Sequence, residues 1–197
     1  MNTAQPIRDE SELVCFKEYY RTVEPNTRNY LMMIMGLNTA LRISDILEIR
    51  WGDVYDFERQ EYRKHLSIVE QKTDKCSLIF LNKNVKEALA EHLSYLIKSG
   101  KIPEPDTWVF ENLKRPGNPI SRIQAFRIIK KDAEECHLEG VISCHSLRKT
   151  FGYHAWQQGT EPVLLMNIFN HSSFRNTVRY LGIEQDDRDR IFRDINL

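Results

Sequence analysis

The sequence predicts a mainly α-helical protein with one small antiparallel β-sheet, an α+β fold. Over most of the chain, polar capping residues precede stretches in which apolar side chains recur at helical spacing. Only residues 62–70 and 76–81 are rich in Ile, Val, Leu and Tyr in the manner of strands. The chain has 197 residues, 41% of them apolar, and no apolar run near the ~20 residues that cross a bilayer. We therefore expect one globular domain over residues 1–197 with a substantial core.

The N-terminal helices are predicted from the residues that begin them. Asp9 and Glu12 resemble a capping box, and an apolar stripe follows at Leu13, Phe16, Tyr19 and Tyr20. Asn26 is suited to cap a second helix that continues through Ala40, and Ser44 can cap a third.

The segments Tyr62–Glu70 and Cys76–Leu81 are predicted strands, and the polar residues 71–75 between them predict a hairpin turn. A loop with Pro and Gly at residues 101–119 separates two groups of further helices. Those helices are expected at Asn84–Ser99, Ser121–Leu138, His145–Gln158, a short segment opened by Thr160 and Pro162, and Ser172–Leu181.

Cysteine usage and the N-terminal segment indicate a cytoplasmic protein. Cys15, Cys76, Cys136 and Cys144 have no C-x-x-C spacing, so four reduced thiols and no metal site are expected. Residues 1–13 are polar and charged and lack the basic-then-apolar pattern of a secretory signal. We expect no membrane partner and no cofactor.

The charge distribution points to a nucleic-acid partner although the 28 basic and 28 acidic side chains cancel. Residues 61–150 carry a net charge of +4, and residues 112–131 contain no acid. We expect double-stranded DNA to contact this run, with Gln124 reading bases beside Arg122 and Arg127. A solvated helix face is the alternative. The basic residues of the run are Lys114, Arg115, Arg122, Arg127, Lys130 and Lys131.

Two arginine motifs predict an anion site. Arg42 lies among apolar residues at a junction between helices, where Asp45 could be its structural partner. His145 and Arg148 are one helical turn apart and share a helix face. Either motif alone is also compatible with a purely structural role.

Three further residues complete an ordered set. Lys72 lies in the predicted hairpin turn, His171 lies in Asn-His-Ser-Ser, and Tyr180 follows His171 by nine residues. Taken singly, a turn lysine is usually solvated and a tyrosine after a helix is usually a core or rim aromatic. The order Arg, hairpin Lys, His-x-x-Arg, His, Tyr is very rare by chance.

With these motifs the sequence resembles the tyrosine recombinase, or phage integrase, family over nearly its whole length. Arg42 and Asp45 match an A-R-x-S-E-like segment, and Lys72 matches the hairpin lysine, with Lys75 as the second choice. The other matches are His145 and Arg148 to H-x-x-R, His171 to an L-G-H-S-S-like segment, and Tyr180 to the nucleophile. Two departures are Leu41 for Ala and Phe169-Asn170 for Leu-Gly; Asn170 is expected to alter the turn that aims His171.

This residue set suits phosphodiester cleavage by a phenol. Arg42 and Arg148 would stabilise charge on the non-bridging oxygens, and His171 would add a donor. His145 would accept the phenol proton of Tyr180, and Lys72 would protonate the leaving 5′-oxygen. Asp45 would support Arg42 from behind. No metal is needed for this chemistry.

The resemblance implies the catalytic-domain fold of the family, a covalent 3′-phosphotyrosyl intermediate and rejoining without ATP. It also implies that a separate N-terminal core-binding domain is missing, since 41 residues precede Arg42. We expect a monomer or weak oligomer in isolation and a homotetramer on DNA. In that tetramer, residues 183–197 would dock on a neighbouring protomer or fold back on their own domain.

Site-specific recombination is the first hypothesis for function, and the sequence does not choose among integration, excision, inversion and dimer resolution. A type IB topoisomerase-like nicking-closing enzyme would share the chemistry without needing a docking tail. A catalytically idle DNA-binding accessory would keep the fold and lose the site. A metal-dependent hydrolase is disfavoured because carboxylates are lacking near His145 and His171.

Overall fold

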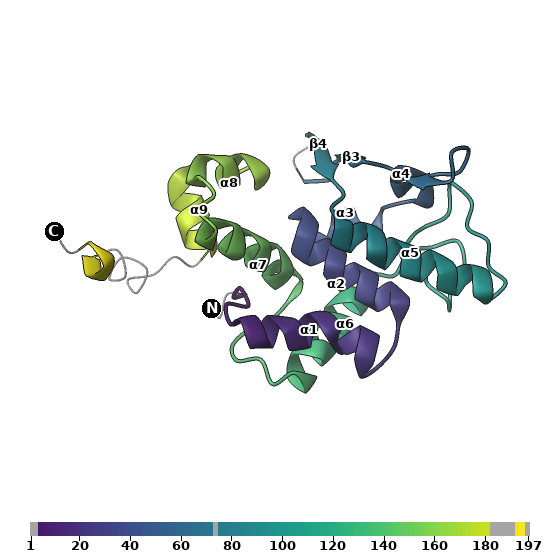
Figure 1. Cartoon of the computed structure of the whole chain (residues 1–197), viewed down its shortest axis with the longest axis horizontal. Coiled ribbons are helices and arrows are strands. Elements are labelled where there is room, and N and C mark those ends of the chain that lie inside the picture. The colour runs from purple at the N-terminus through teal and green to yellow at the C-terminus, as the bar shows by residue number, and fades with distance from the viewer. Residues whose placement is uncertain (1–3, 73–74, 182–191, 196–197) are drawn as a thin grey trace.

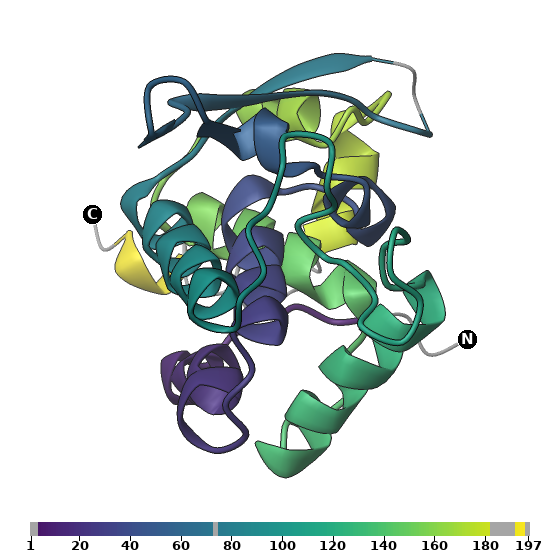
Figure 2. The same cartoon turned by 90° about the vertical axis from the view of Figure 1, so that its right-hand side faces the viewer.

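The computed structural model describes residues 4–72, 75–181 and 192–195. Helices cluster around a central helix, α2, with a β-hairpin across one end (Figures 1 and 2). The elements are α1 Glu10–Thr22, α2 Thr27–Thr39, α3 Ile43–Leu47, α4 Trp51–Val54, β1 Tyr55–Asp56, β2 Glu61–Tyr62, β3 His65–Val69, β4 Cys76–Phe80, α5 Lys83–Lys98, α6 Arg122–Glu135, α7 Cys144–Gln157, α8 Pro162–Ile168 and α9 Phe174–Leu181. The predicted α+β fold is confirmed.

The N-caps of the first two helices are those that the sequence predicts. The Asp9 carboxylate accepts hydrogen bonds from the backbone N–H groups of Ser11 and Glu12, and the Asn26 side chain accepts one from Asn29 N–H. The third helix begins earlier than predicted, because Arg42, rather than Ser44, is its N-cap.

The predicted hairpin is present as the antiparallel pair β3–β4, with His65 opposite Phe80 and Val69 opposite Cys76. The first strand is shorter than predicted. Tyr62 belongs to a separate two-stranded pair with Tyr55, and the chain bends at residues 63–64 before β3 begins. The register of β3–β4 places Lys72 in the turn between the two strands.

The core is built around α2, whose buried face includes Leu31, Met32, Met33, Ile34 and Met35. Such a helix, buried on nearly all sides, is expected for the centre of a bundle. Helices α1, α5 and α7 pack against it. Gly36 lets α7 approach closely, because a Cβ at that position would lie 2.5 Å from the Leu147 side chain.

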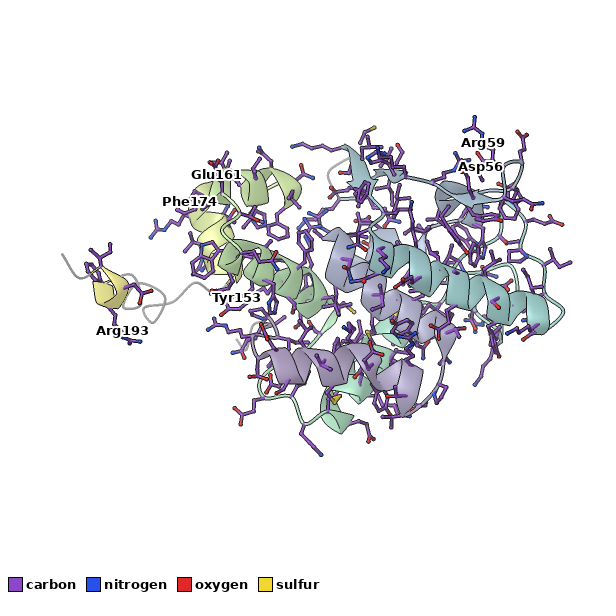
Figure 3. The ribbon with its side chains drawn as sticks, viewed as in Figure 1. Asp56, Arg59, Tyr153, Glu161, Phe174 and Arg193 are labelled. Atoms are coloured by element: carbon purple, nitrogen blue, oxygen red, sulfur yellow. A yellow bond between two sulfur atoms is a disulfide. The ribbon has the colours of Figure 1, made fainter. Side chains whose placement is uncertain are left out.

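A second, smaller core lies between α7, α8 and α9. It contains Ala40, Leu165, Phe169 and Leu181, with Tyr180 packed on its edge. Gly152 of α7 makes this packing possible, since a Cβ there would lie 2.4 Å from Phe169 and 2.5 Å from Leu181. Figure 3 shows Glu161 and Phe174 at this end of the molecule, with Asp56 and Arg59 at the opposite end.

The C-terminal segment lies largely outside the described residues, so the predicted docking of residues 183–197 stays a prediction. Residues 192–194 form one helical turn, and the side chains of Phe192 and Ile195 are exposed. Within the described residues, no helix is long and apolar enough to span a membrane.

The expectation of four reduced thiols is wrong for two of the cysteines. Cys15 of α1 and Cys136, at the end of α6, form a disulfide with their Cα atoms 5.9 Å apart. Cys76 and Cys144 are free thiols. The two bonded cysteines are 121 residues apart, so no local spacing announces the pair.

This disulfide should stabilise the fold, because it joins two residues that are 121 positions apart and so reduces the conformational entropy of the unfolded chain. We expect the Cys15→Ser variant to lose about 2–4 kcal/mol of unfolding free energy. Chemical denaturation with and without a reducing agent measures this loss. A Cys76→Ser variant is the control, and equal stability of the oxidised protein and Cys15→Ser would contradict the prediction.

Candidate active site

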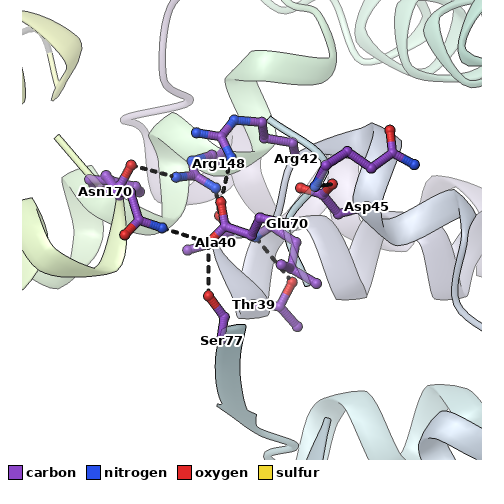
Figure 4. Close-up of polar contacts among 11 residues, drawn as sticks. Thr39, Ala40, Arg42, Asp45, Glu70, Ser77, Arg148 and Asn170 are labelled. Atoms are coloured by element: carbon purple, nitrogen blue, oxygen red, sulfur yellow. Dashed lines mark hydrogen bonds and ion pairs between the residues drawn. The ribbon is translucent and has the colours of Figure 1, made fainter. Parts of the chain in front are cut away.

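Arg42 follows the C-cap of α2 and precedes α3. The C-cap, Ala40, adopts a left-handed conformation with φ 56° and turns the chain toward the β-hairpin. There the Arg42 guanidinium forms an ion pair with Glu70, whose side chain is 3% exposed (Figure 4). The Arg42 side chain remains 20% exposed, so the guanidinium is anchored on one side and open on the other.

The predicted Arg42–Asp45 pair is therefore wrong. Asp45 is buried on α3, and its Oδ1 atom accepts a hydrogen bond of 3.1 Å from the backbone N–H of Gln71. Asp45 thus holds the base of the hairpin turn, while the partner of Arg42 comes from the end of β3. The reason is geometric, because Arg42 precedes the helix on which Asp45 lies and its side chain reaches toward the hairpin.

Arg148 is the buried member of the set, with 3% of its surface exposed. Its guanidinium donates to the backbone carbonyl of Ala40 and, over 3.0 Å, to that of Phe169. These bonds join α7 to the end of α2 and to the end of α8 (Figure 4). Two charge-assisted bonds in a buried place fix the orientation of the guanidinium.

Four of the predicted catalytic side chains line one pocket of about 340 Å³. They are Arg42, Lys72, His145 and Arg148, and the remaining lining residues are Ile43, Ser44, Gln71, Arg122 and Cys144. A pocket lined by this many cations suits a phosphate diester. A larger pocket of about 430 Å³, lined by residues of α5 and of the 101–113 loop, shares none of these residues.

His171 and Tyr180 lie beside this pocket and do not line it. Their ring centroids are 5.0 Å apart, and both rings contact Phe169, whose backbone carbonyl accepts from Arg148. The Nδ1 atom of His171 lies 3.0 Å from the hydroxyl of Thr177, which orients the imidazole ring. The structure therefore brings all six predicted catalytic residues into one neighbourhood in two groups.

Asn170, a departure from the family motif, shapes the turn before His171 through both its backbone and its side chain. Asn170 adopts a left-handed conformation, φ 53°, which Asn tolerates better than most residues with a Cβ. Its side-chain amide donates a 2.7 Å hydrogen bond to Glu70. The side chain thus adds a contact to the hairpin, and the expected alteration of the turn stays a prediction.

Burial and neighbouring cations shift the proton affinities at the site. Burial raises the pKa of Tyr180, and Arg148 and Arg42 act against that increase. Desolvation lowers the pKa of His145, and Lys149, Arg148, Arg122 and Arg42 lower it further. Burial and the two arginines also lower the pKa of His171. Both imidazoles are therefore neutral at pH 7, and a neutral His145 can accept a proton.

The structure divides the residues predicted to contact DNA. Arg122 lines the pocket, and Lys114, Arg115 and Arg127 are exposed. Gln124 takes part in the capping box of α6, where its side-chain oxygen accepts from Ser121 N–H at 2.8 Å. Lys130 pairs with Glu134, and Lys131 pairs with Glu24. Contact of this set with DNA stays a prediction.

Two residues of the site were not identified from sequence. Glu70 follows β3 without any motif of its own, although its place two residues before Lys72 puts it near the site. Lys149 directly follows Arg148, and its ammonium lies 5.0 Å from the centroid of the Tyr180 ring. Among the described residues, no cluster of three His, Cys, Asp or Glu side chains could hold a metal ion.

The comparisons with known proteins agree with this geometry. The profile of the phage integrase family matches residues 9–186. The probable integrase/recombinase YoeC of Bacillus subtilis (strain 168) is 38% identical over 186 residues, which cover 94% of this chain and 93% of YoeC.

Two solved structures have the same fold. The crystal structure of the XerA recombinase has a TM-score of 0.76 at 17% identity, and the match covers 98% of this chain and 66% of that one. The XerH recombinase bound to its palindromic difH substrate has a TM-score of 0.73 at 19% identity, covering 96% of this chain and 53% of XerH. This chain thus spans about half to two thirds of these two structures.

The chain belongs to the phage integrase family, and the predicted catalytic-domain fold is confirmed. The predicted enzyme class, a tyrosine-type DNA recombinase, is confirmed with it.

The lowered pKa of His145 predicts the acidic limb of activity. If His145 accepts the Tyr180 proton, DNA cleavage is lost as the pH falls through a pKa below the ordinary value of 6.5, where the imidazole becomes protonated. Single-turnover cleavage rates between pH 5 and 9 measure this limb. We expect the His145→Gln variant to cleave DNA slowly and to show no loss of rate at low pH. A loss of wild-type rate that begins at or above pH 7 would contradict the assignment of His145 as the proton acceptor.

Proposed function

We propose that the protein is a site-specific recombinase that cleaves and rejoins DNA through a covalent 3′-phosphotyrosyl intermediate. The observation that carries this proposal is the pocket in which Arg42, Lys72, His145 and Arg148 meet, with Tyr180 beside it. Guanidiniums, a hairpin lysine, an imidazole and a phenol are the groups that metal-independent transesterification of a phosphodiester uses.

Each group has a place in the bond changes. The Tyr180 oxygen attacks phosphorus, the Oη–P bond forms, and the bond from phosphorus to the 5′-oxygen breaks with its electron pair on that oxygen. His145 takes the phenol proton, and Lys72 gives a proton to the 5′-oxygen. Rejoining reverses these steps with a 5′-hydroxyl as nucleophile, so no external energy source is consumed.

The cations stabilise the transition state. Negative charge grows on the non-bridging oxygens, where Arg42 and Arg148 donate and His171 adds a further hydrogen bond. The Arg148 guanidinium donates hydrogen bonds to two backbone carbonyls, so its position is fixed before DNA binds. Such preorganisation avoids reorganisation during the reaction.

Double-stranded DNA is the proposed partner, contacted by the exposed basic residues Lys114, Arg115, Arg122 and Arg127. The substrate-bound structure of the similarly folded XerH supports this partner. On DNA we propose a homotetramer in which residues 183–197 dock on a neighbouring protomer. We also propose that the protein acts in the cytoplasm. The name of YoeC, a probable integrase/recombinase, supports DNA recombination and does not choose among integration, excision, inversion and dimer resolution.

A trapping experiment tests the nucleophile. A pool of duplexes with a randomised core and a nick near the cleavage position releases its short 5′-hydroxyl fragment after cleavage, so the covalent adduct accumulates. We expect a slow-migrating adduct on a denaturing gel for the wild type and none for Tyr180→Phe, because phenylalanine has no nucleophilic oxygen. Tyr153→Phe is a matched control. An adduct with Tyr180→Phe would overturn the assignment, and binding without any wild-type adduct would indicate an accessory protein.

A change of leaving group tests Lys72. We expect Lys72→Ala to slow adduct formation by about 10²–10⁴-fold on ordinary DNA, since a general acid contributes rate enhancement of this size. DNA with sulfur in place of the scissile 5′-oxygen releases a thiolate that needs no proton, so the same variant should then cleave at close to the wild-type rate. Lys75→Ala is the control for the neighbouring lysine. An equal deficit on both substrates would contradict the role of Lys72 as the acid.

A further inference from the structure

We propose that Glu70 is a positioning residue, which sets Arg42 for phosphate contact and, through Asn170, fixes the His171 loop to the hairpin that carries Lys72. This inference rests on the proposed recombinase function. It concerns a buried carboxylate and an asparagine that stands where the family usually has glycine.

Glu70 lies where three parts of the site meet (Figure 4). One carboxylate oxygen, Oε2, pairs with the Arg42 guanidinium. The other, Oε1, accepts from the Asn170 amide at 2.7 Å and from the Ser77 hydroxyl at 2.8 Å. A carboxylate has about four acceptor positions, so these three donors occupy most of them.

The three donors come from different elements. Arg42 precedes α3, Ser77 is on β4, and Asn170 lies in the loop between α8 and α9. The backbone N–H of Glu70 also donates to the backbone carbonyl of Lys75 and so joins the two sides of the hairpin. Glu70 thus connects the hairpin, the first arginine and the segment that presents His171.

The burial of Glu70 makes this connection firm. Glu70 is 2% exposed, and an ionised carboxylate this far from water is stable only with charged or hydrogen-bonding partners. Moving Arg42 away would leave that charge uncompensated. The ion pair therefore restrains Arg42 to one orientation, with the exposed part of its guanidinium free for a phosphate oxygen.

Asn170 adds a contact that the glycine of the family motif could not make. The backbone at this position needs a left-handed conformation, which glycine adopts without strain and Asn adopts at small cost. Only Asn adds an amide that reaches Glu70. His171 directly follows Asn170 in the chain. The hydrogen bond from the Asn170 side chain to Glu70 therefore limits how far the His171 loop can move from the hairpin.

Because Glu70 is negatively charged, its replacement by Gln should change DNA affinity and cleavage rate in different directions. A carboxylate near the scissile phosphate repels it, so Glu70→Gln should by charge alone leave DNA binding unchanged or tighter. Loss of positioning should instead slow cleavage. We expect adduct formation by Glu70→Gln to be about 100-fold slower, as for a reacting group misplaced by about 1 Å. Its DNA affinity, measured in a Tyr180→Phe background, should be equal to or above that of the Tyr180→Phe protein.

A neutral phosphate separates positioning from general damage. Methylphosphonate at the scissile position removes the charge that Arg42 neutralises, so the deficit of Glu70→Gln should shrink to less than about tenfold on that DNA. Asn170→Gly, which restores the family residue, should slow cleavage of ordinary DNA by about tenfold, and its effect should be non-additive with Glu70→Gln. Asp132→Asn is the control for replacing a buried carboxyl group by an amide: Asp132 is 0% exposed on α6, where burial raises its pKa to about 8, and cleavage should remain at the wild-type rate.

The outcomes separate the two hypotheses. No adduct from the wild type would refute the proposed function. A wild-type adduct together with wild-type rates for both Glu70→Gln and Asn170→Gly would refute only the positioning role, as would an equal Glu70→Gln deficit on both substrates. If Glu70→Gln does not fold, Asn170→Gly decides alone, and a wild-type rate for that variant overturns the proposal.

Discussion

The buried guanidinium of Arg148 is the interaction on which the rest of the site depends. A cation that is 3% exposed must be satisfied by the protein, and Arg148 is bonded to backbone carbonyls at the ends of α2 and α8. Those two chain ends lead directly into Arg42 and His171. A single side chain therefore sets where the other anion-binding groups begin. Its planar fork allows this, since a lysine ammonium could not hold two carbonyls in fixed directions and still face a phosphate.

Much of this molecule could be predicted from sequence because it is specified locally. Asp9, Asn26 and Ser121 cap helices through bonds to residues two or three positions ahead, and His145 and Arg148 share a helix face by their spacing. The order of the motifs predicted the family, and the family resemblance proposed Tyr180 as the nucleophile. What failed depends on distant contacts: Glu70 is 28 residues from Arg42, and Cys136 is 121 residues from Cys15. No pattern in the intervening sequence fixes either distance.

The neutral overall charge of the chain conceals a strong separation of charges. The cations of the pocket include Arg42, Arg122 and Arg148, whereas part of the basic run on α6 is already paired, Lys130 with Glu134 and Lys131 with Glu24. A phosphate backbone would compete with those acids for the paired lysines, whereas the exposed Arg127 has no acidic partner within the part of the chain that the structure describes. Binding strength should then come from few contacts, with a shallow dependence on salt. In the proposed recombinase, selectivity would then come from base contacts more than from general attraction to DNA.

Gly152 has a consequence for how the reaction can be switched off. The missing Cβ lets Phe169 and Leu181 rest directly on α7, and that helix also carries His145 and Arg148. Tyr180, the proposed nucleophile, therefore shares one packed frame with His145, its proposed proton acceptor, and with the buried Arg148. A small tilt of α7 would displace these three side chains together, whereas movement of the hairpin would displace Lys72 and, through Glu70, the contacts to Arg42 and Asn170. The packing at Gly152 thus ties three proposed roles, nucleophilic attack, proton acceptance and anion binding, to the position of a single helix.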